Sequence, residues 1–163
     1  MYYNVIYKND YWINKQKYID MIKELFKNDN SKIANIQEIE NHLDFIFNKE
    51  IDNDAMLILK VKNNKIISMI NFLQYDNIDN LWCLFSLFTL KSERRKGYAE
   101  KILKYGIERV KEKKAKLLIS GIKEENKESI LLHEKVGFKY SGKYWDEIAE
   151  GFPENHLAFI YEF

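Results

Sequence analysis

The feature that most constrains the fold is a long apolar segment, Leu81–Leu90, in the middle of the chain. Branched, aromatic and other apolar residues make up nearly all of it, and such residues favour β-strands. A strand without a polar face has to be covered on both sides. The segment is also far shorter than the roughly 20 residues that a membrane-spanning helix needs. It therefore predicts a central strand in a layered sheet.

Hydrophobic periodicity on both sides of this segment alternates between helix and strand. Further strands are expected at Tyr2–Tyr7, Met56–Val61, Ile66–Tyr75, Leu117–Ile122, Phe138–Tyr144 and His156–Phe163. Helices are expected at Ile13–Lys27, from a Ser31 cap to Phe47 (with Ile33, Ile36, Leu43 and Ile46 on one stripe), from Gly97 to Val110, and at Glu125–Val136 with its end at Gly137. The pair Asn63-Asn64 suits the tight turn of a β-hairpin. This order predicts a single domain, residues 1–163, of the α+β (α/β layered) class with a largely antiparallel first half.

Composition excludes several classes of protein. The hydrophobic fraction is 46%, with 10 Phe, 11 Tyr and 3 Trp, which is enough for a core and unlike a disordered chain. The formal net charge of +1 argues against a nucleic-acid partner, which a clear basic excess would mark. The basic run Lys111–Lys116 is interpreted as a solvated helix end, because cations favour helix C-termini.

The single cysteine, Cys83, excludes an internal disulfide and fits a reducing compartment. We interpret it as a small core residue rather than a nucleophile, because a buried free thiol is usually inert. The N-terminus, MYYNVIYKNDYW, lacks the basic and apolar regions of a signal peptide. We therefore expect a cytoplasmic protein with no membrane partner and no metal.

The most informative motif is the basic loop Arg94–Ala99 (RRKGYA), between the apolar strand and the next helix. The first N–H groups of a helix lack intrahelical partners and carry partial positive charge, so they attract anions. Gly97 allows close approach of a backbone or a ligand, and Arg94, Arg95 and Lys96 add long-range attraction. These features favour a pyrophosphate site, but a simple glycine turn before a helix gives the same pattern.

Arg94-x-x-Gly97-x-Ala99 resembles the motif Arg/Gln-x-x-Gly-x-Gly/Ala of the GNAT superfamily of acetyl-CoA-dependent N-acetyltransferases. In that family this loop holds the pyrophosphate of acetyl-CoA. Downstream, Asn126–Phe138 (NKESILLHEKVGF) is similar to the second family motif, which an Asn opens and a Gly-Phe pair closes. The close match covers Leu81–Gly142, and the earlier elements agree with the family only in their order.

The resemblance implies a GNAT fold, a mixed and mostly antiparallel sheet with helices on both faces and a splay between the fourth and fifth strands. Pantetheine would lie in that gap. The coenzyme-binding residues implied are Phe88, Thr89 and Leu90 through their backbone, the loop residues Arg94, Arg95, Lys96, Gly97, Tyr98 and Ala99, and Asn126 and Ser129. The partners implied are acetyl-CoA as cosubstrate and a primary amine of a small molecule or protein, and a homodimer is compatible with the fold.

The second motif departs from the family at His133, where many relatives carry a Tyr that acts as general acid. Tyr, with a pKa near 10, keeps its proton at pH 7, whereas His, with a pKa near 6.5, is mostly neutral there. Two interpretations of His133 stay open. It donates an N–H to the leaving sulfur, or it only lines a helix face.

A general base and an acceptor pocket have no motif of their own. Some relatives place a Glu on the central strand, but Leu81–Leu90 contains neither a carboxylate nor a His. The alternatives near the closing strands are Asp146, Glu147, Glu154 and His156, or a chain of waters. Trp145 and these acids, with Tyr11 and Trp12, would suit a cationic amine, but they equally fit surface charge and core aromatics.

The sequence thus predicts an N-acetyltransferase in which an amine attacks the thioester of acetyl-CoA directly, with a backbone N–H of the central strand stabilising the oxyanion. The alternative is an acyl-CoA-binding sensor or regulatory module of the same fold with little catalysis. The missing carboxylate on the central strand and the His at position 133 keep that alternative open.

Overall fold

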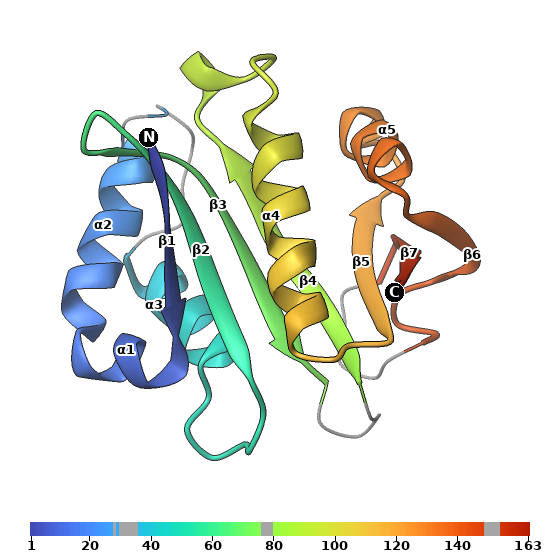
Figure 1. Ribbon diagram of the computed structural model, residues 1–163, viewed down its shortest axis with the longest axis horizontal. Helices are drawn as coiled ribbons and strands as arrows, with labels where there is room; N and C mark the ends of the chain where they lie inside the picture. The colour runs from blue at the N-terminus through green and yellow to red at the C-terminus, as the bar shows by residue number, and fades with distance from the viewer. Residues whose placement is uncertain (28, 30–35, 76–79, 149–153) are drawn as a thin grey trace.

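The computed structural model describes residues 1–27, 29, 36–75, 80–148 and 154–163. Its elements, in chain order, are β1 (Tyr2–Tyr7), α1 (Lys8–Ile13), α2 (Lys15–Lys27), α3 (Ile36–Ile46), β2 (Ala55–Lys62), β3 (Lys65–Gln74), β4 (Leu81–Thr89), η1 (Lys91–Glu93), α4 (Tyr98–Glu112), β5 (Leu117–Lys123), α5 (Lys127–Val136), β6 (Lys139–Tyr144) and β7 (His156–Glu162). Figure 1 shows them as one layered unit with the sheet in its middle.

The described strands form one sheet in the order β1-β2-β3-β4-β5-β7-β6. All neighbours are antiparallel except β4 and β5, which run parallel. These two strands pair only over Leu81–Leu84 and Leu117–Ser120, and beyond that point they diverge. The expected mixed sheet, with β4 at its centre and a splay between the fourth and fifth strands, is confirmed.

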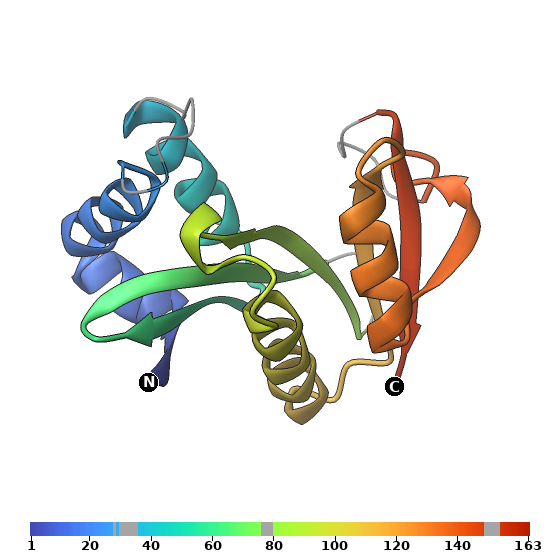
Figure 2. The same cartoon turned by 90° about the horizontal axis from the view of Figure 1, so that it is seen from above.

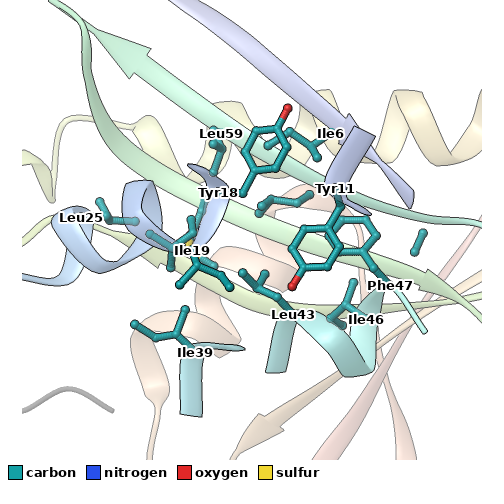
Figure 3. Close-up of a cluster of buried hydrophobic side chains, with 14 of the residues drawn as sticks. Ile6, Tyr11, Tyr18, Ile19, Leu25, Ile39, Leu43, Ile46, Phe47 and Leu59 are labelled. Atoms are coloured by element: carbon teal, nitrogen blue, oxygen red, sulfur yellow. The ribbon is translucent and has the colours of Figure 1, made fainter. Parts of the chain in front are cut away.

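Alternation along β2 sends side chains into two separate cores, because successive residues of a strand face opposite sides of the sheet. Leu57 and Leu59 pack with α1, α2 and α3 (Figure 3), whereas Met56 and Ile58 pack with α4. Figure 2 shows the same division, with α1–α3 on one face of β2–β4 and α4 on the other. Helices on both faces explain why β2 is buried along almost its whole length.

Helix α4 approaches the sheet closely at Gly106, in the middle of the helix. A Cβ atom at this position would lie 2.3 Å from Cε2 of Phe72 on β3. Glycine is unfavourable inside a helix, so the close packing explains its presence there. This contact fixes the distance of α4, and therefore of the Arg94–Ala99 loop before it, from the sheet.

The first helical region differs from the predicted single helix over 13–27. Helical structure begins five residues earlier, at Lys8, and is interrupted at Asn14, where φ is −124° and ψ is 30°. The Asp10 carboxylate accepts a hydrogen bond from the Tyr7 N–H at 3.4 Å, which helps to start α1 directly after β1. The buried ring of Tyr11 then anchors this short helix in the core.

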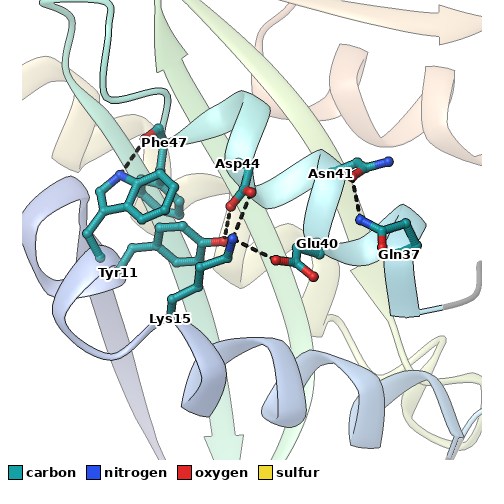
Figure 4. A network of polar contacts seen from close by, with 8 residues as sticks. Tyr11, Lys15, Gln37, Glu40, Asn41, Asp44 and Phe47 are labelled. Carbon is teal, nitrogen blue, oxygen red and sulfur yellow. Dashed lines mark hydrogen bonds and ion pairs between the residues drawn. The ribbon is translucent and has the colours of Figure 1, made fainter.

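Helix α3 is clamped to α1 and α2 by a polar network (Figure 4). Asp44 accepts hydrogen bonds from the hydroxyl of Tyr11 at 2.7 Å and from Nζ of Lys15 at 2.8 Å. Lys15 also pairs with Glu40 at 2.7 Å. The buried Leu43, Ile46 and Phe47 confirm the stripe expected for this helix. The predicted Ser31 cap and Ile33 lie outside the described residues.

Strand β4 changes character along its length. Leu81–Leu84 is buried, but Phe85, Leu87 and Phe88 are only half-buried and Ser86 is exposed. Pairing with β3 shifts between Met69 and Asn71, where β4 contains an extra residue, and Ser86 adopts a left-handed φ of +53°. The expected coverage on both faces therefore holds only for the first half of the strand. Its second half borders the cavities described next.

Candidate active site

The splay leaves a cavity of about 330 Å³ between Leu84–Leu87 of β4 and Ser120–Lys123 of β5. We call it the splay cleft. A second cavity of about 720 Å³, the loop cavity, lies between the end of β4, the Arg94–Ala99 loop and the first half of α5. Leu87, Asn126 and Ser129 line both. The two cavities are therefore neighbouring parts of one groove along the second half of β4.

The Arg94–Ala99 loop contains two left-handed residues, Arg95 with φ of +63° and Gly97 with φ of +76°. Gly97 is the N-cap of α4 and no side chain caps the helix there. The first N–H groups of a helix have no intrahelical partner, and the start of α4 lines the loop cavity. Alternating left- and right-handed residues also form concave arrays of N–H groups that bind anions.

The cations of this loop are not free charges, contrary to what their sequence suggests. Arg95 pairs with Glu128 of α5 at 3.1 Å, and both side chains are exposed. Lys96 pairs with Glu93 at 3.2 Å. Because exposed ion pairs contribute little and exchange easily, the backbone N–H groups supply most of the preorganised attraction for an anion at this loop.

Arg94 has a structural role in this arrangement. Its Nε donates to the Thr89 carbonyl at 2.9 Å, and its guanidinium lies 3.5 Å from the buried carboxylate of Asp29. The same carboxylate accepts a hydrogen bond from the N–H of Lys91. Asp29 and Arg94 together fix the path of the chain from β4 into the loop.

The direction of the backbone N–H and C=O groups differs among the β4 residues that the family resemblance assigned to pantetheine. The N–H of Leu90 donates to the Ile67 carbonyl of β3 at 3.0 Å, and successive strand residues direct their backbone groups to opposite edges. Phe88 and Leu90 therefore face β3, whereas Leu87 and Thr89 face the gap. Leu87 was not among the residues expected from the sequence, because a strand's hydrogen-bonding edge cannot be assigned without its pairing register.

Asn126 and Ser129 lie at the start of α5, on the wall opposite β4. Asn126 is the N-cap, and its side-chain oxygen accepts a hydrogen bond from the N–H of Ser129 at 3.2 Å. Such a cap satisfies one of the open N–H groups of the helix. Helix α5 ends at Gly137 with φ of +118°, as the sequence predicted.

His133 is almost completely buried, with 1% exposure, on the inner side of α5. Its Nδ1 lies 2.8 Å from the carbonyl of Ser129, and because a carbonyl only accepts, Nδ1 carries the proton. Nε2 then accepts a hydrogen bond from the Ser120 hydroxyl at 3.1 Å. Burial lowers the pKa of His133, so the ring is neutral near pH 7. His133 lines the splay cleft together with Ser120.

The base candidates from sequence lie in different surroundings. His156 lines the splay cleft. Glu147 accepts a hydrogen bond from the N–H of Tyr144 at 2.6 Å and is exposed. Asp146 and Glu154 are exposed as well. Position alone therefore favours His156 within this group.

The aromatic residues considered for an acceptor pocket do not line one cavity. Trp145 is buried against Gly121 and lines the splay cleft, whereas Tyr11 is a core residue and Trp12 lines a shallow depression beside α3. Cys83 is buried, and burial raises the pKa of its thiol to about 12. Its interpretation as a core residue is confirmed.

A histidine that the sequence analysis missed lies on the other side of β4. His42 of α3 places Nε2 3.1 Å from Nδ2 of Asn71 and 2.9 Å from Oγ of Ser86. Burial lowers its pKa. No local spacing marks it, because its partners are on β3 and β4, far away in sequence.

His42 lines a third cavity of about 300 Å³, which we call the α3 pocket. Its walls are mostly apolar and come from α2, α3, β3 and β4. Ser86 and Leu87 border both this pocket and the splay cleft. The second half of β4 is thus the shared wall between a groove on the α4–α5 side and a pocket on the α3 side.

The described strands splay at their only parallel pair, and the Arg94–Ala99 loop lies beside the gap. The sequence profile of the Acetyltransferase (GNAT) family matches residues 19–138. The chain therefore belongs to the GNAT acetyltransferase family and is an N-acetyltransferase by class. A search of curated protein sequences gave no significant match.

Solved structures show the same fold over the whole chain. A GNAT-family acetyltransferase from Staphylococcus aureus Mu50 is 20% identical, with 99% of each chain covered and a TM-score of 0.68. The PaiA N-acetyltransferase of Thermoplasma acidophilum, solved with coenzyme A, is 15% identical, with 100% of each chain covered and a TM-score of 0.61. A GNAT-family acetyltransferase from Elizabethkingia anophelis with bound acetyl-CoA is 18% identical, with 85% of this chain and 88% of that chain covered and a TM-score of 0.61.

No helix among the described residues has the length and apolar character needed to cross a membrane. Within the same part of the chain, no group of three or more His, Cys, Asp or Glu side chains is arranged to hold a metal ion.

Proposed function

We propose that this enzyme transfers the acetyl group of acetyl-CoA to a primary amine by direct attack of the amine on the thioester. The observation that carries the proposal is the continuous groove along β4. It has an N–H cradle at Arg95–Ala99 at one end and the splay cleft at the other, with Leu87, Asn126 and Ser129 lining both parts. A cradle followed by a narrow cleft suits a pyrophosphate followed by a pantetheine arm.

The start of α4 and the left-handed loop would bind the pyrophosphate through backbone N–H groups. The backbone of Leu87 and Thr89, directed to the gap, would pair with the pantetheine amides as an added strand does. This arrangement extends the thioester into the splay cleft beside Ser86. A backbone N–H of β4 there can donate to the oxyanion that forms when the amine attacks.

Acid catalysis by His133 stays a prediction. The hydrogen bonds of His133 show which protonation state the ring would need in order to donate a proton. The neutral ring carries its proton on Nδ1, which donates to Ser129, so Nε2 has no proton to give. Only the protonated ring could pass one to the Ser120 hydroxyl, and Ser120 in turn to the leaving sulfur. A coenzyme thiol with a pKa near 8.5 is already a fair leaving group, so this path would assist the reaction without being indispensable.

Calorimetry with acetyl-CoA and S-acetylpantetheine tests the groove directly. We expect acetyl-CoA to bind and S-acetylpantetheine, which lacks the pyrophosphate, to bind at least about tenfold more weakly, since charge-assisted hydrogen bonds to the cradle are lost. Release of free thiol in the presence of a broad panel of amines would then show transfer. Absence of binding at millimolar acetyl-CoA contradicts the proposal. Binding without thiol release for any amine favours the sensor alternative.

A further inference from the structure

We propose that the α3 pocket holds the acetyl acceptor, a small primary amine with an apolar body, and that Nε2 of His42 takes the proton which the amine loses. This inference rests on the proposed function and specifies its acceptor and its base. Neither follows from the loop motif or from the family match, because both features concern the coenzyme side of β4.

The lining of the α3 pocket specifies the class of amine. Ile22, Ile39, Leu43 and Met69 are buried apolar residues on its walls. Phe26 of α2 and Phe88 of β4 meet edge to face with their ring centroids 4.9 Å apart, and both border the pocket. A volume of about 300 Å³ is at the lower end for ligand sites. The pocket therefore suits a compact hydrocarbon or aromatic body rather than a polycation.

Two polar groups on α3 indicate where the amino group would lie. Glu38, one helical turn before His42, also lines the pocket as an exposed acidic residue. Nε2 of His42 carries the lone pair of the ring, because the amide nitrogen of Asn71, 3.1 Å away, can only donate. A bound amine would take the place of this donor. Burial keeps the imidazole neutral near pH 7, which is the form that accepts a proton.

Ser86 joins this pocket to the thioester. Its left-handed φ of +53° and the extra residue in β4 turn its side chain towards α3, where Oγ lies 2.9 Å from Nε2 of His42. Ser86 also lines the splay cleft. An amine nitrogen held beside Ser86 and His42 would therefore be next to the position proposed for the acetyl carbonyl.

The chemical step balances with these groups alone. The ammonium form of the acceptor first loses one proton to solvent. The lone pair of the neutral amine then forms the N–C bond while the carbonyl π electrons move to oxygen, and the proton on the now cationic nitrogen passes to Nε2 of His42. The oxyanion then re-forms the C=O bond as the C–S bond breaks, and the sulfur leaves as a thiolate. The imidazolium of His42 returns its proton to solvent.

The position of His42 is also fixed, as a proton acceptor requires. Asp44, two residues further along α3, accepts from Tyr11 and Lys15 and so clamps the helix to α1 and α2. These contacts of Asp44 hold α3 in place and so limit the movement of His42, although His42 itself takes no part in them.

Steady-state acetylation with four amines tests the inference on the whole protein. 2-Phenylethylamine and hexylamine represent apolar bodies, whereas spermidine and glycinamide represent polar ones. We expect kcat/KM to be at least about tenfold higher for the apolar pair, which matches the discrimination that an apolar pocket gives. The variant Phe26→Ala should reduce this preference severalfold and leave the dissociation constant of acetyl-CoA unchanged.

The variant His42→Gln tests the base. We expect kcat to fall at least about 30-fold, within the range for general-base catalysis, while acetyl-CoA binding and the thermal unfolding midpoint stay the same. Asn41→Gln is the matched control, because the neighbouring Asn41 side chain is exposed and bonds to Gln37, away from the pocket. This control should keep wild-type kcat.

The possible results separate the inference from the proposed function. If acetyl-CoA binds but no amine is acetylated, the proposed function fails. If polar amines are acetylated as well as or better than apolar ones, or if His42→Gln keeps wild-type kcat, transfer stands and the inference is overturned. A folded His42→Gln protein that no longer binds acetyl-CoA also overturns it, because His42 would then belong to the coenzyme side.

Discussion

The cavities on the two sides of β4 are formed by different parts of the chain. On the α4–α5 side, the groove uses backbone N–H groups, helix caps and charges already paired with carboxylates. On the α3 side, the pocket uses apolar side chains and one histidine. In the proposed function, backbone groups would recognise the constant coenzyme, whereas side chains, which change without disturbing the fold, would recognise the variable acceptor.

The histidines on these two sides make the contrast specific. Burial lowers the pKa of both His42 and His133. His133, however, has its N–H bound to the Ser129 carbonyl and its lone pair bound to Ser120. His42 presents its lone pair to Asn71 and Ser86 at the wall of a pocket. Burial is common to both histidines and therefore does not distinguish them. The hydrogen-bond partners of their ring nitrogens, and the cavity that each ring borders, are what differ.

On the α5 side of β4, a loss of turnover smaller than that of His42→Gln is expected from His133→Ala. Turnover should fall at least about tenfold, and the free energy of unfolding should fall by about 1–3 kcal/mol, because Ser120 and Ser129 lose a buried partner. His133→Tyr should keep activity, since Tyr supplies a proton donor at this position. Thiol-release kinetics and denaturant unfolding measure the two quantities.

An unchanged rate in His133→Ala would remove this residue from the mechanism. Loss of stability without loss of turnover would assign His133 a purely structural role and sharpen the contrast with His42. Turnover should therefore be measured at a temperature where each variant is fully folded.

An effect on binding rather than on turnover is expected from Gly97→Ala, which acts only on the coenzyme side. No heavy atom outside its neighbours lies within 4 Å of the position of an added Cβ, so the cost comes from φ of +76° alone. A left-handed non-glycine residue costs roughly 1–2 kcal/mol, which corresponds to about a five- to thirtyfold weaker binding of acetyl-CoA if the loop relaxes.

Gly97→Asn is the matched control for this change, because Asn tolerates the left-handed region better than Ala. Calorimetry should place its affinity between those of the wild type and Gly97→Ala. The KM for the amine should not change in either variant. Equal affinity of all three proteins, with equal stability, would contradict the role given to the loop conformation.

The smallest effect concerns pH. In the folded chain the pKa of His133 lies below the value near 6.5 of an unfolded chain. Between these two values the unfolded state binds a proton that the folded state does not, so the free energy of unfolding falls as pH falls below about 6.5. One such group contributes a slope of at most about 1.4 kcal/mol per pH unit.

Denaturant unfolding between pH 5 and pH 7 measures this slope. His133→Gln and His42→Gln should each show a shallower slope than the wild type, and the more deeply buried His133 should account for the larger part. Identical slopes in all three proteins would show that neither histidine is kept neutral by the fold.

Local signals predicted much of this molecule and missed what distant contacts create. The hairpin turn at Asn63-Asn64 was predicted from residue type, and both residues have left-handed φ angles of 49° and 60°. The break at Asn14 was missed, because it depends on a helix that starts directly at the end of β1 and on the burial of Tyr11. The helical spacing of apolar residues in the sequence continues across this break, so the spacing does not reveal it.

The candidate site divides in the same way. The motif residues Gly97 and Asn126 act within their own turn of helix, as an N-cap conformation and an N-cap side chain, so spacing revealed them. Arg94 was predicted as a loop cation that attracts the coenzyme, and its ion pair with Asp29, which is remote in sequence, was not predicted. His42 carried no signal, because its partners Asn71 and Ser86 approach it only across the packed sheet.

The sequence by itself determined the order of elements, the central strand and the loop that marks the family, since each depends on periodicity or on a few adjacent residues. Tertiary structure alone decided which backbone groups of β4 face the gap, which cations are already paired and which histidine borders a pocket. These properties depend on strand register and on contacts between distant segments, and such contacts form only when the chain packs.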